Sequence, residues 1–172
     1  MKKFVSLILV AIGLTASASA AVVIGGSAGY LIDSEEEYFT ARLGYEFNST
    51  TAFAHQAEIE FGYTESKESG VFGSIAPLTA NYRFLSAAGE KFSYHVGAGA
   101  GVAQVKVEVG STSTNSQPFV AQAFAGVDYR ITPSLSINLD AKYLWIDDVE
   151  LYGITAEVGD DVALSAGISF KF

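Results

Sequence analysis

The last nine residues of the chain, LSAGISFKF, alternate strictly between apolar and polar side chains and stop on an aromatic residue. A period of two is typical of a β-strand that has one face against an apolar environment. The apolar face carries Ile168, Phe170 and Phe172 to the final residue, with nothing hydrophilic to cover it. The frayed end of a soluble domain seldom carries two phenylalanines. A strand that faces lipid and ends at a membrane interface accounts for them.

The start of the chain supports this interpretation. Lys2 and Lys3 precede an apolar run over residues 4–14, and small residues follow as far as Ala20. This pattern predicts a secretory signal peptide, residues 1–20, cleaved after Ala20. The apolar run is too short to cross a bilayer as a helix. We therefore expect an exported protein whose mature part, residues 21–172, forms one domain.

Composition excludes several classes of protein. The chain has no cysteine, so neither disulfides nor thiolate metal sites are possible. The net charge is −9, and the predicted leader contributes only positive charge, so the mature part is more acidic still. A nucleic-acid partner is not expected, because binding needs a basic surface. Hydrophobic residues make up 49% of the chain, yet alternation spreads them out. A membrane β-barrel or a soluble barrel with an apolar interior remains.

Eight alternating stretches can be marked along the mature chain. They cover residues 22–31, 38–47, 54–64, 72–85, 92–109, 119–131, 135–146 and 162–172. The connections alternate between short ones, 48–53, 86–91 and 132–134, and longer, mostly acidic ones, 32–37, 65–71, 110–118 and 147–161. This predicts an all-β fold, an eight-stranded antiparallel up-and-down transmembrane β-barrel with short periplasmic turns and longer extracellular loops. Pro77 interrupts the fourth stretch, so we expect there either a bulge or a longer second loop.

The choice between the two barrels depends on which face is inside. A lipocalin-like soluble barrel would place the apolar face inward and the charged face in water. A membrane barrel does the reverse. Aromatic residues gather near both ends of the stretches, as in the two interfacial girdles of outer-membrane barrels. The polar face is also rich in glycine and serine, which a narrow interior needs in order to fit long side chains from other strands. Both features favour the membrane barrel.

On this assignment the interior carries charges of both signs. They are Arg42, Arg83, Arg130, Lys142 and Lys171 with Glu46, Glu58, Glu60, Asp128 and Asp140. Folding the chain back at 48–53 places Arg42 opposite Glu58 or Glu60. Because a lone buried charge is costly, we expect these residues to pair. A structural ion-pair network that fills the lumen is favoured over a proton or ion path, since an eight-stranded barrel is just wide enough to be filled by side chains.

No catalytic, cofactor or metal site is predicted. The glycine-rich segment 97–103 alternates along a strand and lacks the last glycine of a nucleotide-binding motif. His95 is expected inside the barrel as a hydrogen-bonded structural residue, and His55 on the lipid side near an interface. No serine and acid partners for His95 are recognisable.

Acidic residues of the longer connections form a candidate contact surface, namely Glu35, Glu36, Glu37, Asp147, Asp148 and Glu150. Carboxylates suit Ca²⁺ or Mg²⁺, which could bridge to lipid phosphates. Their spacing matches no calcium-binding loop, so we favour a solvated surface.

The eight strands, the turn and loop asymmetry, the hairpin YRFLSAAGEKFSYHVGAGAGV (residues 82–102) and the ending GISFKF resemble a known family. They are similar to the small outer-membrane β-barrels of the OmpA-like and opacity-porin superfamily, over residues 21–172. The resemblance implies an outer-membrane location among lipids that include lipopolysaccharide. It also implies that Ile168, Phe170 and Phe172 form the signal recognised by the barrel-assembly machinery.

Three roles follow from this fold. We expect a monomeric, non-enzymatic barrel with a structural or surface-contact role in the cell envelope. A narrow porin-like channel for small solutes is the first alternative, and the inward charges argue against it. A lipid-modifying outer-membrane enzyme is the second, and the absence of a histidine on the loop side argues against that.

Overall fold

The computed structural model describes residues 20–68, 71–110, 112–151, 154–156 and 159–172. Within these ranges the chain forms β-strands joined by turns, and none of the described residues form a helix that could cross a membrane. The strands are β1 (Ala21–Leu31), β2 (Glu36–Phe47), β3 (Phe53–Glu68), β4 (Val71–Ala87), β5 (Phe92–Val109), β6 (Thr112–Ser116), β7 (Phe119–Arg130), β8 (Leu135–Ile146), β9 (Val149–Leu151), β10 (Ile154–Ala156) and β11 (Gly159–Lys171). All but one residue of the predicted signal peptide lies outside the described residues, so its cleavage stays a prediction.

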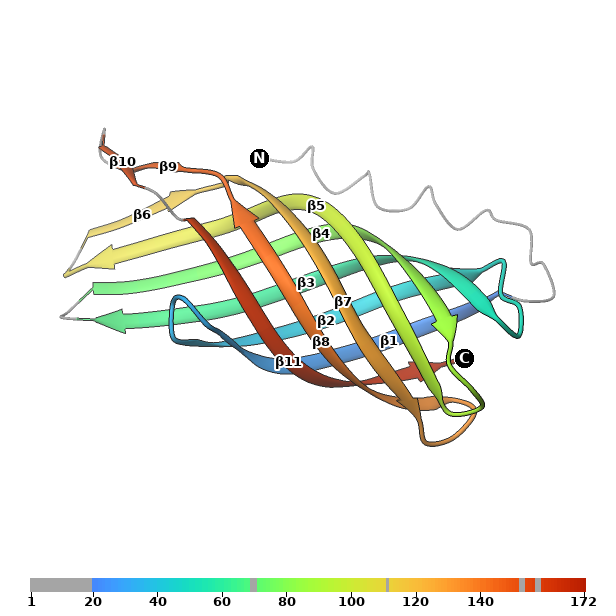
Figure 1. Cartoon of the computed structure of the whole chain (residues 1–172). Helices are drawn as coiled ribbons and strands as arrows, with labels where there is room; N and C mark the ends of the chain where they lie inside the picture. The colour runs from blue at the N-terminus through green and yellow to red at the C-terminus, as the bar shows by residue number, and fades with distance from the viewer. Residues whose placement is uncertain (1–19, 69–70, 111, 152–153, 157–158) are drawn as a thin grey trace.

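Eight of these strands close into one antiparallel barrel (Figure 1). Each barrel strand pairs with its neighbour in the sequence, and β11 returns to pair with β1. The amide of Phe172 continues this seam by donating to the carbonyl of Val22 at 2.9 Å. β6 extends the sheet at β5 beyond the barrel, while β9 and β10 form a separate small hairpin. The predicted eight-stranded up-and-down barrel is confirmed.

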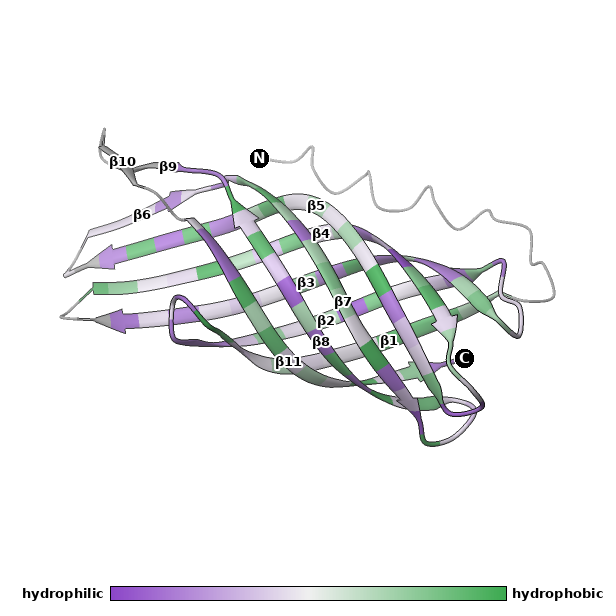
Figure 2. Cartoon of the chain, viewed as in Figure 1, coloured by the Kyte–Doolittle hydropathy of each residue, from purple (hydrophilic) through white to green (hydrophobic). Residues whose placement is uncertain are grey.

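The two faces of the strands are also as predicted. Successive residues alternate between apolar and polar along the barrel wall (Figure 2). On β8, Leu139 is 61% exposed on the outside, whereas the next residue, Asp140, is 8% exposed and points inward. In β2 and β3 the charged residues Arg42 and Glu58 are likewise buried in the lumen. An apolar outside with charges inside is the arrangement of a barrel that has lipid as its solvent.

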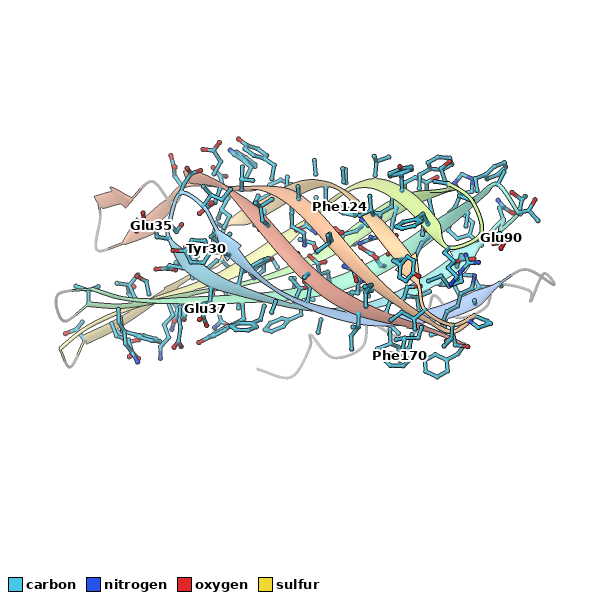
Figure 3. The ribbon with its side chains drawn as sticks, turned by 60° about the horizontal axis from the view of Figure 1, so that its bottom comes forward. Tyr30, Glu35, Glu37, Glu90, Phe124 and Phe170 are labelled. Atoms are coloured by element: carbon cyan, nitrogen blue, oxygen red, sulfur yellow. The ribbon has the colours of Figure 1, made fainter. Side chains whose placement is uncertain are left out.

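Aromatic side chains surround the barrel near both of its ends (Figure 3). We call the end with the short turns 48–52, 88–91 and 131–134 the turn end, and the opposite end the loop end. Exposed aromatic residues near the loop end form an outer girdle: Tyr30, Phe39, Tyr63, Phe119, Tyr143 and Trp145. Those near the turn end form an inner girdle: Phe53, Tyr82, Phe92, Tyr94, Phe170 and Phe172. Amphipathic rings at these two levels mark the interfaces of a bilayer.

The loop end differs from the expectation of four longer loops. The first connection is only residues 32–35, because β2 already begins at Glu36. In the second, predicted over 65–71, β3 and β4 continue as paired strands, with Lys67 opposite Phe72. β5 and β6 extend beyond the barrel in the same way (Figure 1). Strands beyond the lipid no longer need an apolar face, so hydropathy alone does not mark where they end.

Pro77 lies within β4, and neither of the two alternatives predicted for it is correct. The register between β3 and β4 is the same on both sides of Pro77, so there is no bulge. Instead the ladder omits the pairs of Gly62 and Tyr63 with β4. The missing N–H of proline therefore leaves a local gap in the hydrogen bonding without changing the register. The Pro77 ring is buried beside Tyr38 and Gly62, where it helps to fill the lumen.

Candidate functional site

The middle of the lumen is filled by a network of buried charged and amide side chains, which we call the ion layer. Inward positions on six strands reach the same height because alternation aims every second residue at the barrel axis. Arg83 of β4 joins two strands: its guanidinium lies 3.3 Å from a carboxylate oxygen of Glu58 on β3 and 3.6 Å from one of Asp140 on β8. The amides of Gln56 and Asn81 also donate to Glu58.

His95 of β5 lies between two carboxylates in this layer. Its Nδ1 is 2.7 Å from Asp128 and its Nε2 is 2.6 Å from Asp140, and the side chain is fully buried. A neutral imidazole has only one N–H, so these two contacts require one further proton in the group. With that proton, the positive charges of the layer are Arg42, Arg83, Lys142 and the His95 group. They balance its four carboxylates, which belong to Glu58, Glu60, Asp128 and Asp140.

A second chain of contacts crosses the lumen from β8 to β3. Lys142 pairs with Glu60, and the side-chain amide of Gln122 on β7 donates to Glu60 at 3.1 Å. The same amide donates to Asn81 and Thr79 on β4. Two pairs of consecutive strands that are far apart in the sequence, β3 with β4 and β7 with β8, are thereby tied together across the interior.

Arg42 corrects the predicted pairing. Its backbone lies opposite Glu60, as expected from the turn, but its guanidinium forms no ion pair with Glu58 or Glu60. Arg83 and Lys142 already occupy those carboxylates. Arg42 instead donates to Ser169 at 2.6 Å and to Asn138 at 3.2 Å.

The remaining predicted inward residues lie nearer the turn end. Lys171 of β11 pairs with Glu46 of β2 at 2.6 Å. Arg130 is exposed and donates only to the carbonyl of Glu90, at 3.4 Å. The structure thus brings eight of the ten predicted residues into ion pairs, all except Arg42 and Arg130.

Above the ion layer, toward the loop end, the lumen is filled by an apolar layer that the sequence analysis did not predict. Its buried members are Leu31, Tyr38, Ala103, Val105, Val120, Leu144 and Ala163, with Ile75, Val107 and Ile146 packed against them. Phe124 lies within the ion layer, with the Arg83 guanidinium 4.7 Å and the Lys142 ammonium 5.9 Å from its ring centroid. Gly97 of β5 makes room for this ring, because a Cβ there would lie 2.3 Å from Phe124.

The turn 32–35 closes over this apolar layer and is held by Asp161 of β11. The carboxylate accepts hydrogen bonds from the amides of Asp33 and Ser34, each at 3.0 Å, and from the Ser34 hydroxyl at 2.5 Å. Asp161 lies in the ladder between the partners of Tyr143 and Trp145, at the level of the outer girdle, which forms the loop-end border of the membrane-spanning part. Burial raises the pKa of Asp161, but these hydrogen bonds outweigh it and hold the pKa below its usual range.

The predicted acidic contact surface divides into two groups at the loop end. Glu35, Glu36 and Glu37 adjoin a groove of about 800 Å³ that also includes Glu65 and Lys67. Glu36 accepts a hydrogen bond from Thr64. The other group follows β8: Asp147 and Asp148 are exposed, and the side chain of Glu150 lies outside the described residues. Among the described residues no cluster of acidic and histidine side chains is placed to hold a metal ion.

Sequence reasoning missed the neutral members of the ion layer. Gln56, Gln122 and Asn138 occupy polar positions of the alternation, so an inward face was assigned to them without a role. Thr79 and Asn81 have the same inward parity as Arg83 on β4, but the sequence analysis gave them no role. The signal that could have found them is the alternation itself, because an amide at an inward position must have a partner.

Comparisons with known proteins agree with this architecture. The family model described as the outer membrane protein beta-barrel domain matches residues 5–172. Three solved structures illustrate the likeness of fold. Neisserial surface protein A is 15% identical, with 89% of this chain and 97% of that chain covered and a TM-score of 0.66. Ail, the attachment invasion locus protein of Yersinia pestis, is 14% identical, with the same coverage and a TM-score of 0.59. The outer membrane enzyme PagL is 15% identical, with 86% and 98% covered and a TM-score of 0.53. Among curated proteins, none resembles the sequence closely enough to count as a relative.

Proposed function

Because the chain belongs to the outer membrane protein beta-barrel domain family, we propose that it serves as a closed, non-catalytic barrel of the outer membrane that makes contacts at the cell surface. The observation that carries this proposal is the filled lumen. An ion layer and an apolar layer lie in series between the turn end and the loop end, so a solute would have to displace both.

The loop end supplies a surface for such contacts. The extensions of β3, β4, β5 and β6 form a wall that stands beyond the outer girdle on one side of the barrel. At the foot of this wall lies the acidic groove beside Glu35 and Glu65. Ail, the attachment invasion locus protein of Yersinia pestis, has the same fold, and this likeness supports a contact role at the surface.

Conductance in planar bilayers tests whether the lumen is closed. We expect the wild-type protein to give no resolved current steps. The double variant Glu60→Ala/Lys142→Ala removes a pair that spans the lumen and should give small steps, provided that it keeps the heat-dependent gel mobility of a folded barrel. Regular steps from the wild-type protein would replace the proposal with a narrow channel for small solutes.

Amine labelling of intact cells tests the orientation. Lys67 and Lys106 lie on the wall, whereas Lys91 lies in a short turn at the other end. A reagent that does not cross the membrane should modify Lys67 and Lys106 and leave Lys91 unmodified until the cells are broken. The reverse pattern would place the wall in the periplasm and remove the contact surface from the proposal.

The enzymatic alternative has its own test. The chain has two histidines, and neither lies at the loop end: His95 is in the ion layer, and His55 is beside Tyr82 of the inner girdle. We therefore expect the mass profile of lipid A to be the same in cells that lack the protein and in cells that overproduce it. A mass change that follows the protein level would overturn the non-catalytic proposal.

A further inference from the structure

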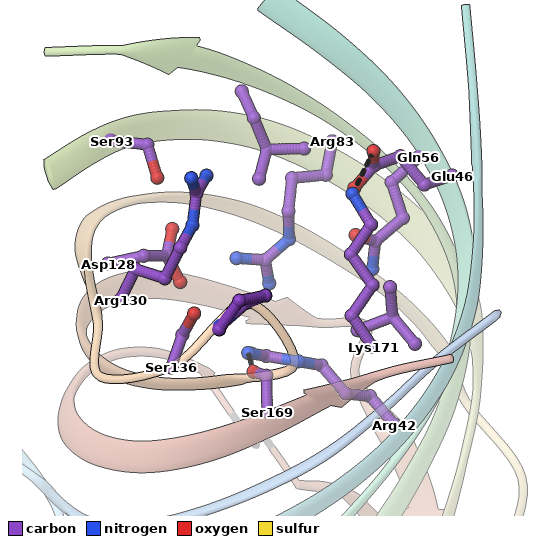
Figure 4. A pocket seen from close by; sticks show the side chains of 13 residues that line it. Arg42, Glu46, Gln56, Arg83, Ser93, Asp128, Arg130, Ser136, Ser169 and Lys171 are labelled. Carbon is purple, nitrogen blue, oxygen red and sulfur yellow. Dashed lines mark hydrogen bonds and ion pairs between the residues drawn. The ribbon is translucent and has the colours of Figure 1, made fainter. Parts of the chain in front are cut away.

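The turn end of the lumen holds a cavity of about 240 Å³ between the ion layer and the short turns (Figure 4). Four basic side chains line it: Arg42, Arg83, Arg130 and Lys171. Three serine hydroxyls, of Ser93, Ser136 and Ser169, line it as well. Guanidinium groups and hydroxyls together are the donors that proteins use for carboxylates and phosphates.

Two of these basic residues have no carboxylate partner among the described residues. Arg42 is 7% exposed, and both of its hydrogen bonds go to uncharged acceptors, Ser169 and Asn138. Its Nε is buried without any partner. Arg130 has only a long hydrogen bond to a backbone carbonyl. Arg42 therefore has no direct ion pair, and its buried guanidinium keeps donor capacity that an anion in the cavity could use.

The acidic groups at the cavity are already engaged. Glu46 is paired with Lys171, and Asp128 with His95. The cavity wall therefore carries more positive than negative charge, in a chain whose net charge is −9. Such a local reversal of sign attracts small anions from the adjoining solution.

We propose that this cavity binds a small oxyanion, a carboxylate or a phosphate group, with Arg42 as the buried anchor and Arg130 at the entrance. The hydroxyls of Ser93, Ser136 and Ser169 complete the donor set. The proposal is independent of the surface role, because the cavity opens at the turn end and the contact surface lies at the loop end.

Titration of the folded full-length barrel in detergent micelles tests the site. The probes are inorganic phosphate in one arm and acetate in the other, with chloride at matched ionic strength as the reference. The readout is the NMR signals of Ser93, Ser136 and Ser169. We expect saturable shifts, and the arm that gives the tighter binding identifies the group. Absence of saturable shifts with both anions would overturn the proposal.

Three variants locate the binding. Arg42→Gln and Arg130→Gln should each weaken the affinity by about tenfold or more, as expected for the loss of a charge-assisted hydrogen bond. Lys106→Gln removes the same charge from the wall at the loop end and should leave the affinity unchanged. If Arg42→Gln does not fold, Arg130→Gln decides, because its side chain is exposed and makes no ion pair. Equal affinity in wild type, Arg130→Gln and Lys106→Gln would mean that the cavity is not the site.

Discussion

The two layers of the lumen are built on opposite principles. In the ion layer, Arg83 and His95 each have two carboxylate neighbours, one on the adjacent strand and one, Asp140, on β8 across the lumen. In the apolar layer, residues such as Val120 and Leu144 fill space in the manner of a soluble protein's core. The stability of the ion layer depends on each charge having its partner, and the stability of the apolar layer depends on how completely its side chains fill the volume.

This difference shows where the specificity of such a barrel resides. The lipid-facing surface needs only to be apolar, and many side chains satisfy that condition. Beyond the turn-end cavity, the lumen must be filled by side chains that fit one another, because lipid cannot reach this space. Substitutions in the ion layer should therefore destabilise the barrel by leaving charges without partners, and those in the apolar layer by leaving space unfilled.

Loss of Arg83 should have the largest effect. Arg83→Met leaves Glu58 and Asp140 buried without their shared cation, and breaking a buried pair in this way costs about 3–5 kcal/mol. Arg42→Met is the matched control, since Arg42 has no carboxylate partner and its loss should cost less. The measurement is the free energy of unfolding in urea, followed by gel mobility. Equal losses for the two variants would show that the pairs seen at Arg83 do not govern stability.

A cavity in the apolar layer should have the next largest effect. Leu144→Ala removes an inward side chain that is 4% exposed, and the expected cost is about 2–5 kcal/mol. Leu139→Ala on the same strand removes an outward side chain. It loses the transfer energy of the leucine, but lipid fills the space, so no cavity remains. Unfolding of both variants in urea should show the larger loss for Leu144→Ala. The reverse order would mean that the apolar layer is loosely packed.

A methyl group added to the inner wall should have a smaller effect. In Gly99→Ala the new Cβ would lie 1.8 Å from the amide oxygen of Asn81 and 2.6 Å from the backbone oxygen of Ala80. Overpacking of this kind costs about 1–3 kcal/mol. Gly26→Ala on the lipid-facing side meets only the Thr40 carbonyl, at 3.2 Å, and should change the unfolding midpoint less. Indistinguishable midpoints would show that the wall beside the ion layer can move outward.

The sequence predicted the strands and their two faces because lipid imposes one simple condition on every second residue. The condition is that every second residue, the one that faces lipid, is apolar. Beyond the lipid it no longer holds, and so the continuation of β3 and β4 beyond Thr64 was missed. The apolar layer was missed for a related reason. Val120 and Leu144 lie on strands where both faces are apolar near the loop end, and alternation there no longer distinguishes inside from outside.

The partners in the ion layer were predicted only in part. Turn positions give the backbone register between neighbouring strands, and Arg42 does lie opposite Glu60. Long side chains, however, reach across the lumen to strands that are remote in the sequence, as Arg83 reaches Asp140. Which cation takes which carboxylate depends on the diameter of the closed barrel and on the small residues beside each side chain, and neither can be read from one hairpin.

The smallest expected effect concerns the turn above the apolar layer, and it depends on pH. The hydrogen bonds from Asp33 and Ser34 depress the pKa of Asp161 in the folded protein relative to the unfolded chain. The stabilisation is therefore fully present above the pKa of an unfolded aspartate, about 3.9, and is lost as the pH falls through the lower folded value. Hydrogen exchange should show that the amides of Asp33 and Ser34 keep their protection down to about pH 4 and lose it below, while those of the ion layer stay protected. Asp161→Asn cannot titrate, so protection of the turn in this variant should be independent of pH. If the variant showed the same loss at low pH, the turn would be held by groups other than Asp161, and the apolar layer beneath it would have to supply the restraint.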